Sequence, residues 1–248
     1  MKKKIKVGAV SYLNTKPLIY GFEQGMMKDE VEIKVDYPSS VAAMLLNDEI
    51  DIGLVPVTII PQLEEYHIIG DYCIGTEGEV ASVCLFSDVP VEQIKVVLLD
   101  YQSRTSVRLA AILLKEYWKV NPVLTAADAD YRHHIKGTTA GIVIGDRAFE
   151  QRKISHHSYD LGKAWKELTD LPFVFAAWIS NKKLEDEFIA GFNSTTGAGM
   201  QAIDSIVAEL HYPLFDLKKY FTEHISYTLT ENKKAGLQLF LEKLREMK

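Results

Sequence analysis

The residues best suited to chemistry lie in one loop near the N-terminus. The stretch Val7–Leu18 reads V-G-A-V-S-Y-L-N-T-K-P-L, an apolar run that ends abruptly in polar side chains. Ser11, Asn14 and Thr15 offer hydroxyl and amide groups. Such groups, beside free backbone N–H donors at a helix start, suit a carboxylate or a phosphate. Pro17 fits the first turn of the following helix. The loop therefore predicts either an anion site after the first strand or an ordinary helix cap.

Three more polar turns directly follow predicted strands, and each begins a predicted helix. They are Pro38-Ser39-Ser40, Ser103-Arg104-Thr105-Ser106 and Gly145-Asp146. Each fits a helix N-cap, because short polar side chains satisfy the first N–H groups of a helix. Each also fits an anion contact, since the helix dipole favours negative charge at that end. The sequence leaves both interpretations open.

Other candidate motifs favour structural roles. Thr195–Gly199 is rich in glycine but follows a helical segment, which predicts a break between two helices and not a nucleotide loop. The adjacent pairs His133-His134 and His156-His157 have no further ligand at zinc spacing, so we interpret them as surface residues. Cys73 and Cys84 are the two cysteines, and we expect small buried thiols ahead of a disulfide or redox pair.

Composition is typical of a soluble globular protein. Hydrophobic residues make up 47% of the 248 residues, charged residues 25%, and the formal net charge is −6. The acidic balance and the absence of a basic stripe with aromatics argue against nucleic acid as a partner. No apolar stretch approaches the roughly 20 residues of a membrane span, and the N-terminal lysines precede no signal-peptide core. The sequence predicts a cytoplasmic protein without a membrane or nucleic-acid partner.

The order of elements predicts an α/β protein with two lobes. Apolar strands are expected at 5–10, 31–37, 50–56, 67–74, 80–86, 94–100, near 123, at 141–145 and at 173–179, and helices dominate after residue 182, including 184–192, 200–210 and 233–247. The strands near 80–86 and 173–179 bracket a self-contained unit. The C-terminal helices have no sheet of their own, so we expect them to pack on the first lobe. This predicts lobe 1 at 1–86 plus 178–248, lobe 2 at 87–177, two hinge crossings and a central cleft that would take a small ligand.

The motifs together resemble a known family. V-G-A-V-S-Y-L-N-T-K-P-L, D-I-G-L-V-P-V at 51–57, G-E-V-A-S-V-C-L-F-S at 78–87, S-R-T-S at 103–106 and G-D at 145–146 are similar in order and spacing to the chorismate dehydratase family of the futalosine route to menaquinone. The resemblance runs to about residue 180. It implies the two-lobed fold of type II periplasmic solute-binding proteins, and loss of water from chorismate to give 3-[(1-carboxyvinyl)oxy]benzoate, a lyase reaction without cofactor or metal.

The resemblance also assigns residues. The family's motif positions that contact substrate correspond to Asn14 and Ser82, which we expect to be catalytic. The polar turns supply the expected substrate-binding residues, which are Ser11, Thr15, Ser39, Arg104, Thr105, Ser106, Gly145 and Asp146. We expect the helix start at Arg104–Ser106 to reach the substrate from lobe 2. From lobe 1 we expect the same of Ser11, Asn14, Thr15 and Ser82. The loops hold no obvious strong base, so we hypothesise that the enolpyruvyl carboxylate of the substrate removes the proton.

Two other functions are compatible with the sequence. A sister family in the same pathway, the 1,4-dihydroxy-6-naphthoate synthases, shares the fold and cleaves a larger substrate. A non-catalytic protein that binds a small anion is the second alternative. The resemblance implies chorismate, a dicarboxylate, as the ligand.

Overall fold

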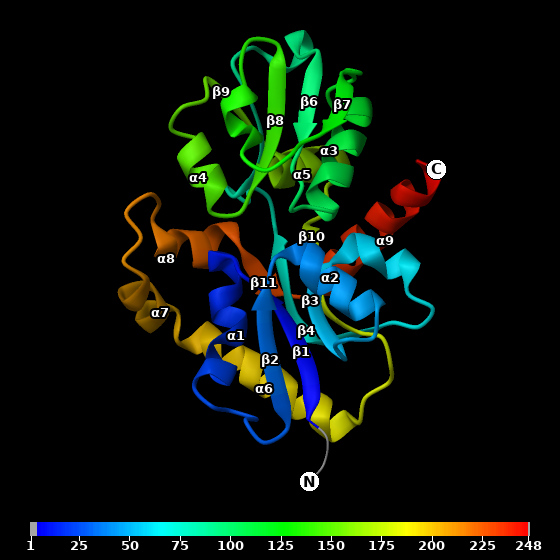
Figure 1. Ribbon diagram of the computed structural model, residues 1–248, viewed down its shortest axis with the longest axis vertical. Helices are drawn as coiled ribbons and strands as arrows, with labels where there is room; N and C mark the ends of the chain where they lie inside the picture. Colours follow the sequence, from blue (N-terminus) through cyan, green and yellow to red (C-terminus); the bar gives the residue numbers. More distant parts are fainter. Residues whose placement is uncertain (1–3, 248) are drawn as a thin grey trace. The chain divides into compact units, whose positions relative to one another are not determined.

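The computed structural model describes residues 4–247, which form two compact α/β units. Unit 1 comprises the chain up to Gly75 and Val174–Thr230. Unit 2 comprises Thr76–Phe173 and the chain from Glu231 onward. Each unit has its own sheet, of six strands in unit 1 and five in unit 2 (Figure 1). The prediction of a two-lobed α/β fold is confirmed.

The sheet of unit 1 mixes parallel and antiparallel strands. Its order is β11-β4-β10-β3-β1-β2. The strands are β1 (Ile5–Val10), β2 (Val31–Asp36), β3 (Ile52–Pro56), β4 (His67–Thr76), β10 (Phe173–Ser180) and β11 (Ser226–Thr228). β1 pairs in parallel with β2 and β3, while β10 runs antiparallel to β3. The carboxyl ends of β1, β2 and β3 therefore meet at one edge of the sheet, where the loop after β1 lies.

The helices of unit 1 bury their apolar residues, which recur at helical spacing along the sequence. They are α1 (Lys16–Glu23), α2 (Pro38–Leu46), α6 (Asp186–Gln201), α7 (Ile203–Leu210) and the short α8 (Leu217–Lys219), with irregular turns at η1 (Leu13–Thr15), η2 (Val57–Gln62) and η5 (Tyr220–His224). The predicted helix break at Thr195–Gly199 is wrong, because this stretch lies inside the continuous helix α6. Its small residues let α1 approach closely: a Cβ on Gly199 would lie 1.7 Å from the carbonyl oxygen of Pro17.

Gly199→Ala should separate α1 from α6 and lower the free energy of unfolding by about 1–3 kcal/mol, because the added methyl meets backbone, which cannot rotate away. Gly191→Ala in the same helix is the matched control. Its Cβ would lie 3.5 Å from Met27 Cε, an ordinary contact, and alanine is the better helix former, so stability should rise by up to about 1 kcal/mol. Urea unfolding of both variants tests the close approach, and equal effects would contradict it.

The sheet of unit 2 has the order β7-β6-β8-β5-β9. Its strands are β5 (Val83–Ser87), β6 (Val96–Leu99), β7 (Val123–Ala126), β8 (Thr139–Ile144) and β9 (His157–Asp160). β6 runs parallel to β7 and β8, whereas β5 runs antiparallel to β8 and β9. The beginning of β5 therefore lies beside the carboxyl end of β8. The predicted strand at 80–86 starts later, at Val83, because residues 80–82 form a tight turn.

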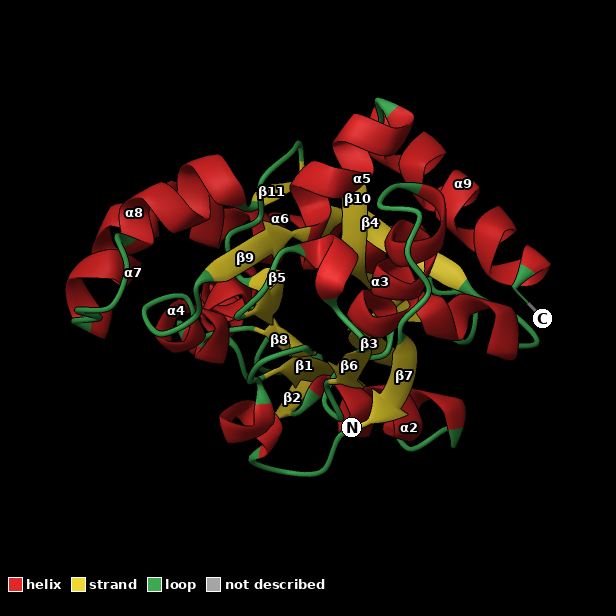
Figure 2. Ribbon diagram, turned by 90° about the horizontal axis from the view of Figure 1, so that it is seen from above, coloured by secondary structure: helices red, strands yellow, loops and turns green. Residues whose placement is uncertain are grey.

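The described part of unit 2 also holds four helices, of which α3, α4 and α5 contact the sheet, and short 3-10 helices at η3 (Val91–Gln93) and η4 (Tyr131–His134). The helices are α3 (Thr105–Glu116), α4 (Arg147–Gln151), α5 (Leu161–Thr169) and α9 (Glu231–Glu246). Figure 2 shows α9 as a long helix beside α3 and α5. The ring of Phe240 in α9 packs 4.9 Å from Phe173 and 6.1 Å from Trp165, and Gly236 faces the Pro172 carbonyl so closely that a Cβ would lie 2.1 Å from its oxygen.

The boundaries of the units differ from the predicted lobes in two places. Residues 76–86, expected in lobe 1, belong to unit 2, because β5 pairs with β8 and β9. Helix α9 belongs to unit 2 as well, because Phe240 completes an aromatic cluster there. The chain consequently passes from one unit to the other three times, after Gly75, Phe173 and Thr230, and not twice. Within residues 4–247, none of the helices has the length and apolar character that crossing a membrane would require.

Candidate functional site

In unit 1, the loop after β1 leaves the sheet at the edge that also holds the carboxyl end of β2. The backbone N–H of Ser11 donates to the carbonyl of Asp36 at the end of β2, at 3.0 Å. Ser11 is exposed, whereas Asn14 and Thr15 are buried in the turn η1. Three of the predicted site residues thus lie together at the start of α1.

Asn14 has an unusual environment for a buried amide. The residue is only 7% exposed, yet its Oδ1 accepts no hydrogen bond from any residue that the structure describes. The Thr15 hydroxyl is in the same situation. The backbone of Asn14 is fixed, because the buried Tyr227 hydroxyl donates to its carbonyl oxygen at 3.0 Å. Buried polar groups are nearly always paired, so these two groups favour a ligand or water as their partner.

The helix-cap interpretation of the two turns in unit 1 is not supported. Asn14 precedes the N-cap of α1, which is Thr15, and Thr15 makes no side-chain cap. In α2 the N-cap is Tyr37, so Ser39 lies inside the first turn, partly exposed and without a capping role.

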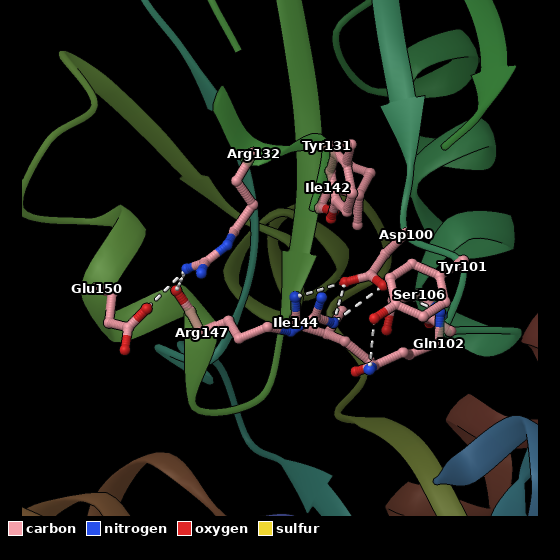
Figure 3. A network of polar contacts seen from close by, with 11 residues as sticks. Asp100, Tyr101, Gln102, Ser106, Tyr131, Arg132, Ile142, Ile144, Arg147 and Glu150 are labelled. Carbon is pink, nitrogen blue, oxygen red and sulfur yellow. Dashed lines mark hydrogen bonds and ion pairs between the residues drawn. The ribbon is translucent and has the colours of Figure 1, made fainter. Parts of the chain in front are cut away.

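In unit 2, the polar turns gather at the carboxyl ends of β6 and β8, and Asp100 joins them (Figure 3). Its buried carboxylate accepts N–H bonds from Gln102 at 3.0 Å and from Ile144 at 3.3 Å. Arg147 donates to both carboxylate oxygens, at 3.0 and 2.7 Å. The guanidinium also lies 5.6 Å from the centre of the Tyr101 ring. One carboxylate therefore ties the loop after β6 to the start of α4.

The Asp100 carboxylate is enclosed on its other side by Tyr131. The Tyr131 hydroxyl donates to the carbonyl of Ile142, and Figure 3 shows its ring beside Asp100. Burial, and then the negative charge of Asp100, raise the pKa of Tyr131 far above its usual range. Tyr131 therefore stays protonated and cannot act as a base near neutral pH.

The predicted site residues of unit 2 fall on these loops. The hydroxyl of Ser103 accepts the Ser106 N–H at 3.0 Å, so this turn caps α3 as one of the two interpretations predicted. Arg104 is partly exposed at the helix start, and Thr105 and Ser106 are buried. Gly145, with φ +64°, turns the chain from β8 into α4, and Asp146 occupies the N-cap of α4.

Ser82 lies in unit 2, and not in the first lobe as expected. It is buried directly before β5, and its carbonyl accepts the Gly145 N–H at 2.9 Å. The structure thus brings Ser82 and Gly145 together.

Sequence reasoning missed Asp100 and Arg147. They are ordinary charged residues in sequence, and only their tertiary partners distinguish them. The cysteines follow the prediction: Cys73 and Cys84 are buried and neither forms a disulfide within the described residues, and burial raises the pKa of the Cys84 thiol. Among residues 4–247, the acidic, histidine and cysteine side chains form no group of three or more that could hold a metal ion.

Comparison with known proteins places the fold and the family. Solved structures similar to the chain include protein AF1704 from Archaeoglobus fulgidus, at TM-score 0.74 and 16% identity, covering 98% of this chain and 97% of that one. The CA3427 gene product of Candida albicans, described as having the generic periplasmic binding protein fold, matches at TM-score 0.62 and 15% identity over 96% and 90% of the two chains. The periplasmic aliphatic sulphonate binding protein SsuA from Escherichia coli matches at TM-score 0.61 and 13% identity over 99% and 93%.

In sequence, the chain is 25% identical to the chorismate dehydratase of Thermus thermophilus over 238 residues, covering 84% of each protein. The family described as "Menaquinone biosynthesis" matches residues 5–246. The family match includes residues of both units and the polar turns described above. The chain belongs to the Menaquinone biosynthesis family, with the fold of the periplasmic binding proteins.

Proposed function

We propose that this chain is a chorismate dehydratase, which converts chorismate into 3-[(1-carboxyvinyl)oxy]benzoate and water. The observation that carries the proposal is the buried amide of Asn14, whose Oδ1 lacks a partner among the described residues. An amide can donate to a carboxylate and accept from a hydroxyl, and chorismate offers both groups. Membership of the family and the relationship to the Thermus thermophilus enzyme support this substrate.

The reaction needs positioning more than a strong base. The hydrogen at C3 of chorismate is acidified by conjugation toward the ring carboxylate, and departure of the C4 hydroxyl makes the ring aromatic. We propose that the enolpyruvyl carboxylate of the substrate takes the C3 proton while the C4 hydroxyl leaves, which together yield one water. Asn14 and Ser82 would contact the substrate, and fixed donors would stabilise the developing charge.

The polar turns would supply the remaining donors. In unit 1 these are Ser11 and Thr15 at the start of α1, with Ser39 in the first turn of α2. In unit 2, Arg104 and the α3 N-terminus offer a cation and N–H groups, which favour a carboxylate. Thr105, Ser106, Gly145 and Asp146 complete the proposed binding residues.

The experiment is incubation of the purified chain with chorismate, followed by absorbance of the aromatic product. We expect catalytic conversion, with many turnovers for each protein molecule. Chorismate that binds, as measured by calorimetry, but is recovered unchanged would indicate a small-anion binding protein. Cleavage of the larger substrate of the 1,4-dihydroxy-6-naphthoate synthases, with chorismate untouched, would indicate the sister activity.

Turnover should be independent of a divalent ion, because aromatisation drives the loss of water and the described acidic, histidine and cysteine side chains form no metal-binding group. Dialysis against EDTA should leave the rate of chorismate consumption unchanged. A rate that falls after dialysis and returns with one particular ion would contradict this prediction.

A further inference from the structure

The three residues 80–82, here called the Ser82 turn, have a strained backbone. The Ser82 N–H donates to the Val80 carbonyl at 2.7 Å, which closes a three-residue γ-turn. The central residue, Ala81, has φ +63°, in the left-handed region that residues with a Cβ avoid. A γ-turn of this hand is rare and strained, so its surroundings must hold it in place.

Asp160 binds the amide side of the Ser82 turn. It ends β9, where it pairs with Cys84 of β5, four residues after Val80. Its carboxylate accepts the Ala81 N–H at 2.7 Å and the Val80 N–H at 3.1 and 3.2 Å. It also caps α5 by accepting the Lys163 N–H at 3.0 Å. Burial raises the pKa of Asp160, while these three N–H donors act in the opposite direction.

Arg152 binds the carbonyl side of the same turn. Its Nη2 donates to the Ala81 carbonyl at 2.9 Å and lies 3.2 Å from the Cys84 sulfur. Its Nη1 donates to the hydroxyl of Ser158 in β9, at 3.2 Å, which fixes the direction of the guanidinium. The peptide groups on both sides of Ala81 are therefore held by side chains of opposite charge.

We propose that Asp160 and Arg152 are positioning residues for Ser82: they hold the strained turn that presents this serine to the substrate. The Gly145 N–H fixes the Ser82 carbonyl from the other direction, so the backbone on both sides of the serine is restrained. A side chain held in advance loses little freedom when the substrate binds, which is the advantage of preorganisation. The inference rests on the proposed function, because it gives Ser82 a role in chorismate dehydration.

The test is a double-mutant cycle with Asp160→Asn and Ser82→Ala, measured as kcat and KM for chorismate. Asparagine keeps one acceptor and can still cap α5, but it cannot accept all of the N–H bonds that the carboxylate holds. Asp160→Asn alone should lower kcat/KM by about tenfold or more. In the Ser82→Ala background the same change should cost less than about twofold, because the residue through which it acts is gone. An equal loss in both backgrounds would overturn the proposal.

Amide hydrogen exchange tests whether Asp160 holds the Ser82 turn, without any assay of activity. In Asp160→Asn, exchange at Ala81 and Ser82 should accelerate by about tenfold or more. Asp216→Asn is the matched control: Asp216, in unit 1, caps α8 by accepting the Lys219 N–H at 3.0 Å, as Asp160 caps α5. It should leave turnover and exchange at the turn unchanged. If the wild-type chain fails to consume chorismate, the proposed function is wrong. Hydrogen exchange still tests whether Asp160 holds the Ser82 turn: exchange that is unchanged in Asp160→Asn would overturn that role.

Discussion

Asn14→Asp should lower the rate of chorismate turnover by about 10²-fold or more. The change adds almost no volume, but it replaces an amide that can donate to a carboxylate with a negative charge. Repulsion of the substrate carboxylate and loss of the donor should together cost about 3 kcal/mol in the transition state. Turnover of chorismate by the variant and the wild type is the measurement.

Folding is the necessary control for Asn14→Asp, because the side chain is buried. Asn14 caps no helix, so survival of the fold depends on whether the new carboxyl is protonated or finds a partner. Asn14→Ala removes the amide without adding a charge and should also be slow. Asn232→Asp makes the same charge change at an exposed position in the first turn of α9, and its rate should equal that of the wild type. A well-folded Asn14→Asp protein with a wild-type rate would remove Asn14 from the mechanism.

Asp100→Asn should lower the free energy of unfolding by about 2–4 kcal/mol. The Asp100 side chain is 0% exposed and accepts bonds from Arg147 and from the N–H groups of Gln102 and Ile144. The variant leaves the Arg147 cation without its counterion and turns an NH₂ group toward N–H donors. Urea unfolding, followed by a probe in unit 2, measures the loss.

Asp170→Asn is the matched control for Asp100. Asp170 forms an ion pair with Lys166 Nζ at 2.7 Å, the same distance as that between Asp100 and Arg147 Nη2. However, the Asp170 side chain is 97% exposed. Water screens exposed ion pairs, and asparagine also tolerates the left-handed backbone at position 170, so stability should not change measurably. If the two variants were equally stable, burial would not be the cause of the Asp100 effect.

The sequence was sufficient to predict most strands and the two-lobed fold, because apolar runs bounded by polar turns depend on local pattern. The predictions were wrong where the structure of a segment depends on its tertiary contacts. The glycines in Thr195–Gly199 indicate a helix break when the neighbouring helix is unknown. In the structure, the missing side chain of Gly199 allows α1 to pack closely against α6. The place of α9 depended on Phe240 meeting Trp165 and Phe173, residues about 70 positions earlier in the chain.

The candidate site residues also include some that the sequence could predict and others that it could not. The positions of Asn14 and Gly145 after strand ends follow from the order of elements, so they could be predicted. The residues that hold the loops could not. Asp100 and Arg147 are 47 positions apart, and Asp160 and Ala81 are 79 apart, so neither pairing leaves a signal in a single sequence. The left-handed Ala81 was equally hidden, since alanine does not indicate a positive φ.

The most direct test of the proposed function is a proton NMR time course of the wild-type chain with chorismate. We expect the ring signals of chorismate to disappear while aromatic signals appear in equal amount. The vinyl signals of the enolpyruvyl group should be retained in the product, whose mass should be lower than that of chorismate by one water. Chorismate that remains intact in the presence of folded protein, or an aromatic product that has lost the enolpyruvyl group, would contradict the proposal.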